Sequence, residues 1–126
     1  MFIPIIAMAA LAVAPSDDVW VKVGETPDSV VHYINVDTLK RSGAGRVTVW
    51  SRIELPKPTF GKETKSMRVL LEHDCLLHKQ RYLQVVSYTG SNLTGHVEFE
   101  VGKGHWAEIE LDSIGSFIHN NICKYR

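Results

Sequence analysis

Residues 46–55 read Arg46-Val-Thr-Val-Trp-Ser-Arg-Ile-Glu-Leu55, and this stretch decides the fold class of the chain. Its apolar residues Val47, Val49 and Ile53 alternate with polar or aromatic neighbours. A period of two is typical of a half-buried β-strand, because successive side chains point to opposite faces of a sheet. We therefore predict a strand here that has one apolar face.

Similar β-rich runs recur at hairpin spacing through the first hundred residues. They cover residues 19–23, 31–36, 67–72, 80–88, 97–101 and 106–111. Turn residues separate these runs, and we predict that Gly102–Gly104 forms a tight hairpin turn before the last one. We expect Pro56 and Pro58 to break the run that starts at residue 46, since proline cannot donate a ladder hydrogen bond.

The pattern changes after Leu111. Asp112 is a candidate helix cap, because its carboxylate can accept a bond from a backbone N–H group. Helical spacing follows, and the apolar stripe that it predicts comprises Ile114, Phe117, Ile118 and Ile122. Short strands followed by one C-terminal helix predict the α+β class, with the helix packed on an antiparallel β-sheet.

Cys75 and Cys123 are the only two cysteines of the chain. Two cysteines in an exported domain most often pair, so we predict a disulfide that ties the helix to the sheet. Two free, buried thiols are the alternative. Cys123 lies off the apolar stripe if the helix continues regularly. We therefore expect the helix to loosen near Asn120–Asn121, so that the thiol can turn toward the sheet.

The prediction of export rests on residues 2–14, which are apolar, uncharged and end in small residues. This stretch is shorter than the roughly 20 residues that span a bilayer, and it has the pattern of a secretory signal peptide. We assign residues 1–14 to a signal peptide, cleaved after Ala14 or Ala12, and residues 15–126 to one exported domain. A buried N-terminal strand or helix is the alternative. The run has no basic residue before it, which leaves open a different start.

The charge of the chain is balanced, with 14 basic and 14 acidic residues and a formal net charge of zero. A balanced charge gives no long-range attraction toward nucleic acid or anionic lipid. We therefore expect no nucleic-acid partner and no stable membrane insertion after the signal peptide is cleaved.

One group of residues resembles a metal cluster, because His73 and His78 flank Asp74 and Cys75. His73 and Cys75 would share one face of a strand, while Asp74 would point away. An oxidised Cys75 cannot ligate a metal ion. We therefore expect scattered surface histidines and no metal site.

The chain has no recognisable nucleophile and base. It contains no Gly-x-Ser-x-Gly motif and no Cys–His pair with a third, orienting group at a known spacing. The carboxylates of Glu98, Glu100, Glu108 and Glu110 alternate in the manner of a solvated strand face. We predict no catalytic residue and no cofactor.

In their predicted strands, Trp20, Trp50 and Trp106 all occupy the positions of the polar residues, which alternate with the aliphatic ones. If these strands share one sheet, the three rings lie on the face opposite the aliphatic residues, and Tyr82 and Tyr88 join them if the register permits. We consider two interpretations of this face. Either the helix or a curl of the sheet covers the rings as core, or the rings form an exposed patch for a protein partner or for self-association.

In the order and spacing of these residues, the chain resembles the surface-adhesin protein E-like domain family of bacterial exported proteins. The similarity runs from about Trp20 to Cys123. The segments that carry it are Trp20–Val23, Tyr33–Leu39, Val47–Trp50, Lys65–Met67 with Asp74–Cys75, Trp106–Ile109, and Asp112–Gly115 leading to Cys123.

The resemblance implies an antiparallel sheet whose C-terminal helix is tied to it by a disulfide, which falls here on Cys75 and Cys123. It also implies an exported location, in the periplasm or at the cell surface of a Gram-negative bacterium. The partners that it implies are host matrix and plasma proteins such as vitronectin, laminin and plasminogen. The sequence as given has no cysteine near the predicted signal cleavage region, so we do not expect the lipidated cysteine of a surface lipoprotein.

The leading hypothesis is therefore a non-enzymatic exported binding module, with Trp20, Trp50 and Trp106 as its candidate patch and a homodimer as a further option. The second hypothesis is a periplasmic protein that supports the envelope by binding a small molecule or by inhibiting an enzyme. A closed apolar pocket between helix and sheet would favour the second. An enzyme is the third, and it would need a titratable group with a strongly shifted pKa in a cleft.

Overall fold

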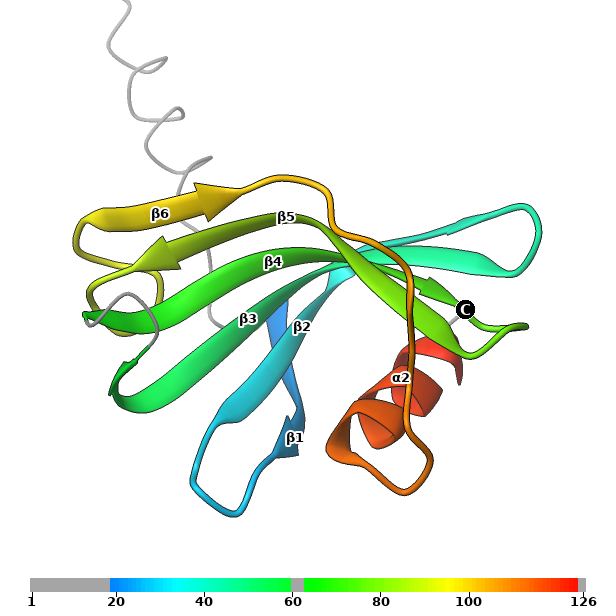
Figure 1. Cartoon of the computed structure of the whole chain (residues 1–126), viewed down its shortest axis with the longest axis horizontal. Coiled ribbons are helices and arrows are strands. Elements are labelled where there is room, and N and C mark those ends of the chain that lie inside the picture. Colours follow the sequence, from blue (N-terminus) through cyan, green and yellow to red (C-terminus); the bar gives the residue numbers. More distant parts are fainter. Residues whose placement is uncertain (1–18, 60–62, 125–126) are drawn as a thin grey trace, which may run out of the picture.

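A computed structural model of the chain describes residues 19–59 and 63–124. The predicted signal peptide and its cleavage site lie outside the described residues. The strands are β1 (Trp20–Glu25), β2 (Val31–Ser42), β3 (Arg46–Thr59), β4 (Thr64–Asp74), β5 (Lys79–Tyr88), β6 (Val97–Val101) and β7 (Ala107–Glu108). One helix, α2 (Ile114–Lys124), follows them and packs on one face of a strongly curved sheet (Figure 1). The predicted α+β fold is confirmed.

The strands pair in chain order from β1 to β6, and every pair is antiparallel. Such an order needs only short connections between neighbouring strands. None of the described helices is long and apolar enough to cross a membrane.

The pairing of β3 with β4 confirms the alternation seen in the sequence. Ile53 lies opposite Met67 and Val49 lies opposite Leu71, whereas Arg52 lies opposite Arg68. Residues that oppose each other in an antiparallel pair share a face, so the aliphatic residues gather on one side. We call this side, on which α2 packs, the inner face, and the opposite side the outer face.

We predicted that the prolines would end β3. This is wrong, because the strand continues to Thr59. The regular ladder does stop there, however. Pairing is continuous up to Glu54 opposite Ser66, shifts in register, and resumes at Thr59 opposite Thr64. Pro56 and Pro58 therefore lie in the irregular stretch, where a missing N–H donor costs no ladder bond.

The predicted hairpin at Gly102–Gly104 is also wrong. β7 pairs with β5, through Lys79 opposite Glu108, and not with β6. β6 and β7 thus follow one another along the same edge of β5. The backbone N–H of Gly104 donates to the carbonyl of Tyr82 at 2.8 Å, and a Cβ on Gly104 would lie 2.8 Å from the Tyr82 ring. Only glycine allows this close approach, which keeps the chain against β5.

The hydrophobic core lies between α2 and the inner face. It consists of Val23, Ile34, Val47, Val49, Ile118 and Ile122. The register of β1 shifts between Lys22 and Gly24. A Cβ on Gly24 would lie 2.9 Å from Ile114 Cδ1, so the glycine lets α2 approach β1 closely.

The start of α2 lies one residue beyond the predicted cap. Ser113 Oγ accepts a bond from the Ser116 backbone N–H at 3.0 Å, which makes Ser113 the capping residue. Asp112 has a φ of 60° and belongs to the preceding turn.

The buried side of α2 also differs from the predicted stripe. Ile118 and Ile122 are buried as expected, but Phe117 is 57% exposed and Ile114 is 37% exposed. His119 and Ser116 are buried in their place. The helix is therefore rotated about its axis relative to the prediction, toward the side that carries His119.

This rotation explains how Cys123 reaches the sheet without any loosening of the helix. α2 runs regularly through Asn120–Asn121 to Lys124, so the predicted loosening is wrong. Cys123 follows His119 by one helical turn and therefore faces the sheet with it. The predicted disulfide joins Cys75, just after β4, to Cys123, with the Cα atoms 5.9 Å apart.

Candidate functional site

The three tryptophans predicted to share a face do lie on one face of the sheet, the outer one. Trp20 in β1 lies opposite Asn35 in β2, which in turn lies opposite Trp50 in β3. Trp106, just before β7, stacks with Arg46 and Arg81. The residues that lie opposite these two arginines in the neighbouring strands are also on the outer face. α2 packs on the inner face, so the helix does not cover these rings.

Each tryptophan ring is accompanied by an arginine. The Arg52 guanidinium carbon lies 4.1 Å from the centre of the Tyr33 ring and 5.4 Å from that of Trp20. The Arg68 guanidinium lies 4.7 Å from the centre of the Trp50 ring. Contacts of this kind contribute roughly 0.5–1 kcal/mol at exposed positions and more when they are desolvated. They hold the rings of Trp20 and Trp50 in fixed positions.

Trp106 has the most such neighbours. The Arg81 guanidinium lies 4.4 Å from its ring centre, and that of Arg46 lies 5.2 Å away. Arg81 also forms an ion pair with Glu72 at 2.7 Å, and Arg46 faces Asp74 at 3.8 Å. The ring is therefore fixed by two cations that are themselves paired with carboxylates.

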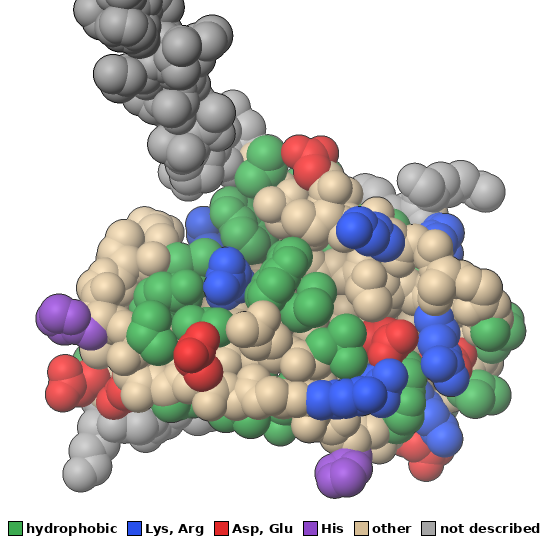
Figure 2. Space-filling view, turned by 90° about the horizontal axis from the view of Figure 1, so that it is seen from above, with side chains coloured by type: hydrophobic (Ala, Val, Ile, Leu, Met, Phe, Trp, Pro, Cys, Tyr) green, Lys and Arg blue, Asp and Glu red, His purple; other side chains and the backbone are tan. Residues whose placement is uncertain are grey.

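Arg52 and Arg68 lie directly opposite each other, although like charges in such positions repel. Glu54 reduces this repulsion, because its carboxylate lies 3.1 Å from Arg52 Nε. Arg52 is only 7% exposed, packed between its aromatic neighbours. The outer face thus combines partly buried tryptophans with arginines. A view from the side away from α2 shows hydrophobic and basic side chains next to one another (Figure 2).

The two tyrosines divide between the faces. Tyr88 lies opposite Ser66 and shares the outer face. The register of β4 and β5 shifts between Leu70 and Leu71, and Tyr82 consequently lies opposite Leu71 on the inner side. The sequence could not show this irregularity.

Two histidines are core residues, so the expectation of scattered surface histidines is wrong for them. His73 in β4 is 0% exposed and His119 in α2 is 1% exposed. Their Nδ1 atoms are 2.7 Å apart, which requires one nitrogen to donate and the other to accept. The ring of His78 packs edge-on against His119, at 4.6 Å between centres.

The sequence did contain a signal for one member of this pair, because His73 continues the alternation of the inward-facing Val69 and Leu71. Burial, and secondarily the neighbouring His119, lowers the pKa of His73 from 6.5 to about 3. Burial first and His78 second lower the pKa of His119, while Asp74 acts in the opposite direction.

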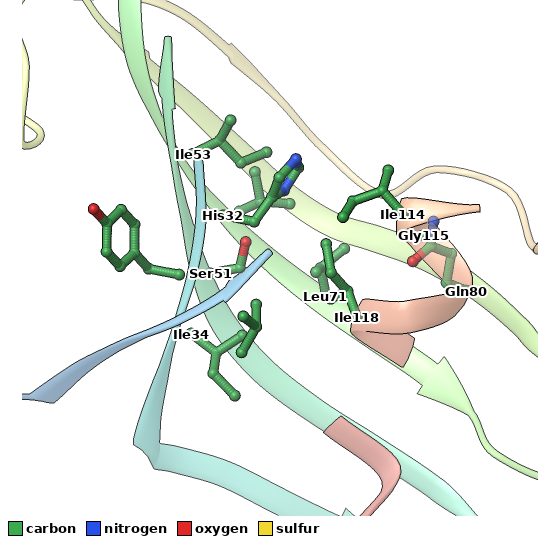
Figure 3. Close-up of a pocket in the computed structure, with 12 residues that line it drawn as sticks. His32, Ile34, Ser51, Ile53, Leu71, Gln80, Ile114, Gly115 and Ile118 are labelled. Carbon is green, nitrogen blue, oxygen red and sulfur yellow. The ribbon is translucent and has the colours of Figure 1, made fainter. Parts of the chain in front are cut away.

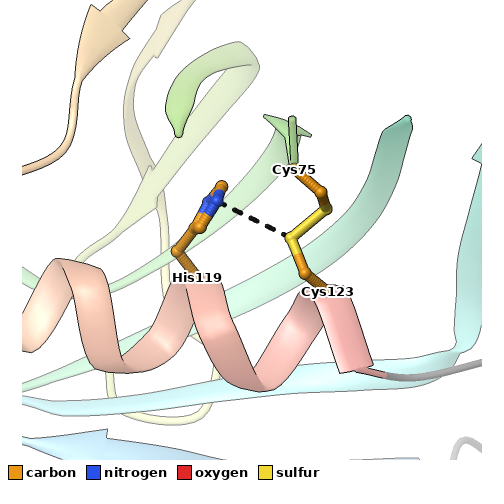
Figure 4. A group of neighbouring side chains, drawn as sticks. All are labelled: Cys75, His119 and Cys123. Atoms are coloured by element: carbon orange, nitrogen blue, oxygen red, sulfur yellow. Dashed lines mark hydrogen bonds between the residues drawn. A yellow bond between two sulfur atoms is a disulfide. The ribbon is translucent and has the colours of Figure 1, made fainter. Parts of the chain in front are cut away.

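The metal cluster considered from the sequence does not assemble as such. The Asp74 carboxylate accepts bonds from the backbone N–H groups of Leu76 and Leu77. A different set of potential ligands comes together where the disulfide meets α2. Cys75, His119 and Cys123 place one ligand atom each within 4.8 Å of one another (Figure 4). With the sulfurs bonded to each other, neither is available as a thiolate.

A cavity of about 150 Å³ lies between the start of α2 and the inner face (Figure 3). Aliphatic side chains form most of its wall, among them Ile53, Leu71 and Ile114. His32, Ser51 and Gln80 add polar groups. Ligand pockets for drug-sized molecules usually measure about 300–1,000 Å³, so this cavity suits a small apolar group.

The architecture defines a class: small domains in which one face of an antiparallel sheet carries a disulfide-tied helix and the other face stays free of it. The family model described as surface-adhesin protein E matches residues 20–124, and the chain belongs to this family. No curated protein matches the sequence.

Solved structures of Haemophilus influenzae protein E share the fold. Crystal form II matches with a TM-score of 0.65 and 12% identity, over 86% of this chain and 90% of that one. Protein E from non-typeable Haemophilus influenzae matches with a TM-score of 0.57 and 12% identity, over 87% of this chain and 78% of that one. The predicted family resemblance is confirmed.

The buried His73 makes stability depend on pH. Its pKa is about 3 in the folded chain, but the ordinary 6.5 when unfolded, so the unfolded state binds more protons between these values. The stabilisation is complete above pH 6.5 and is lost as the pH falls toward 3. Between pH 6.5 and 5 we expect the free energy of unfolding to fall by about 2 kcal/mol through this group.

Urea unfolding of the oxidised protein at a series of pH values measures this loss. His73→Gln is expected to show a shallower pH slope, whereas the control His105→Gln, at an exposed position, keeps the slope of the natural chain. Equal slopes in all three proteins would contradict the assignment.

Proposed function

We propose that this chain is an exported, non-enzymatic binding module that contacts a protein partner through its outer face. The observation that carries the proposal is the row of tryptophans stacked with arginines on the face opposite α2. Membership in the surface-adhesin protein E family supports it.

The residue types suit protein recognition. Trp, Tyr and Arg are the side chains that most often dominate binding energy at protein interfaces. Rings already held by arginines lose little further conformational freedom when a partner binds, so less of the contact energy is offset by ordering. The partly buried tryptophans Trp20, Trp50 and Trp106 provide both properties.

We further propose that the domain resides in the periplasm or at the cell surface of a Gram-negative bacterium. The disulfide supports an oxidising compartment, and the family description supports the surface. Protease treatment of intact cells tells which partners to screen, since only a domain outside the outer membrane is digested without lysis. For a surface location, the proposed partners are host matrix or plasma proteins.

The histidines support a non-enzymatic role. His73 has the most strongly lowered pKa, but it is fully buried and does not line the cavity. His32 does line the cavity, and burial lowers its pKa. Among the described residues, no carboxylate and no second histidine lines this cavity with His32, whereas Asp28 and His32 together line a separate groove.

Binding to immobilised vitronectin, laminin and plasminogen, measured by surface plasmon resonance, tests the outer face. We expect Trp50→Ala and Trp106→Ala to weaken binding at least tenfold, the loss typical of an interface anchor. Both variants should remain folded, because each ring is only partly buried.

Phe117→Ala is the matched control, since Phe117 is a large exposed aromatic residue on α2, away from the outer face. It should bind as the natural chain does. Unchanged binding by both tryptophan variants, an equal loss in Phe117→Ala, or no binding to any of the three proteins would contradict the proposal. So would unfolding of either tryptophan variant, since truncating a core tryptophan costs about 3–5 kcal/mol.

The cavity beneath α2 favours a second candidate function, binding of a small molecule in support of the envelope. A cavity of this size with apolar walls can hold a molecule of about the size of benzene. Ser51, 4% exposed, lies on the inner face opposite Val69 and belongs to the cavity wall. A larger side chain at this position would occupy the space.

Benzene titration, followed by the methyl resonances of Leu71 and Ile118, tests this candidate. We expect shifts in the natural chain and in Ser51→Ala, and none in Ser51→Leu, which fills the cavity while circular dichroism confirms folding. If benzene shifts neither methyl group in the natural chain, the cavity is not a ligand site.

A further inference from the structure

We propose that the reduced form of this protein binds one soft divalent metal ion, of the class of Zn²⁺, through Cys75 Sγ, Cys123 Sγ and His119 Nε2. The proposal concerns the place where α2 meets the end of β4. It is independent of the outer face and of any partner bound there.

The three ligand atoms lie within 4.8 Å of one another, and His119 Nε2 is 3.7 Å from Cys123 Sγ. The two sulfurs, bonded to each other in the oxidised chain, must separate to about 3.8 Å after reduction to share one tetrahedral ion. With Zn–S bonds of about 2.3 Å and Zn–N bonds of about 2.0–2.1 Å, a nitrogen and a sulfur on one tetrahedral ion are roughly 3.5 Å apart. The nitrogen therefore already stands at almost the required distance from this sulfur (Figure 4).

His73 completes the arrangement behind the ligands. When His119 Nε2 binds a metal, its Nδ1 carries the proton and donates a hydrogen bond to His73 Nδ1, 2.7 Å away. Metal-binding histidines almost always donate their second ring N–H to an acceptor, and losing that acceptor typically costs 10–100-fold in affinity. His73 is itself fully buried, so this orienting bond is protected from water. His73 acts here as a positioning residue and not as a ligand.

The access to the site from solvent and the number of protein ligands are also compatible with a bound ion. Cys75 and Cys123 are only partly buried, so an ion can reach the sulfurs from solvent. Three protein ligands leave one position of the tetrahedron for water. Neutral imidazole and thiolate are the ligand types that Zn²⁺ accepts.

The oxidation state decides whether the ion can bind. A dithiol reductant gives two electrons and two protons to the Cys75–Cys123 bond, becomes a disulfide itself, and leaves two thiols on the protein. Zn²⁺ then displaces the two thiol protons. Disulfide and metal exclude each other, yet both connect α2 to the end of β4. The ion would therefore hold the helix in place in a chain whose disulfide is open.

Anaerobic titration of the phosphine-reduced full chain with Co²⁺, followed by displacement with Zn²⁺, tests the proposal. We expect one equivalent of Co²⁺ to bind with tetrahedral d–d bands and a thiolate-to-cobalt charge-transfer band, and Zn²⁺ to raise the melting temperature. The oxidised chain should show neither effect. His119→Gln is expected to bind at least tenfold more weakly, His73→Gln to bind about tenfold more weakly, and the exposed control His105→Gln to bind unchanged.

Three results would overturn the proposal: no binding by the reduced chain, equal binding by the oxidised chain, or undiminished affinity in His119→Gln, which would reduce the site to a plain dithiol. If the reduced chain unfolds without metal, circular dichroism takes the place of the melting temperature. Refolding by Zn²⁺ in the natural chain but not in His119→Gln would then support the site, and a failure to refold would overturn it.

Discussion

The attachment of α2 to the end of β4 is the constraint on which the rest of this structure depends. Two contacts form it, the Cys75–Cys123 disulfide and the buried pair of His73 and His119, and we call them together the helix anchor. The two cysteines are 48 residues apart, so the disulfide closes a loop that contains β5, β6, β7 and most of α2. On the chain-entropy model, a bond closing such a loop stabilises the folded state by about 4 kcal/mol. That is a large share of the roughly 5–15 kcal/mol by which a domain is stable.

The helix anchor also determines what each face of the sheet can do. α2 buries the aliphatic residues of the inner face, and its apolar contacts with Val47 and Val49 make that face the core. The outer face is stabilised differently, by arginines stacked on tryptophans and paired with carboxylates. Such a face is ordered without being covered by the helix. The inner face is thus the core, whereas the outer face, through which we propose that a partner binds, has no helix packed on it.

The sequence predicts the elements well and their mutual contacts less well. Alternation with a period of two located β3 and β4, and parity placed the tryptophans on one face. The rotation of α2 could not be predicted from the sequence, because a pattern of apolar residues does not include His119. The burial of His119 depends on a hydrogen bond to a residue 46 positions away. The pairing of β7 with β5 depends on the approach of Gly104 to Tyr82, again a contact between distant residues. The arginine partners of each tryptophan follow from the register between strands, which no single strand contains.

Hydrogen–deuterium exchange of the oxidised and the reduced chain, both free of metal, tests most directly whether the helix anchor holds α2 on the sheet. The account predicts that reduction removes the protection of amides in α2 first, and next in β1, against which α2 packs at Gly24. The centre of β3 and β4 should keep its protection, because its ladder does not depend on the helix. If the amides of α2 are protected equally in both forms, apolar packing alone holds the helix, and the central role given to the disulfide is wrong.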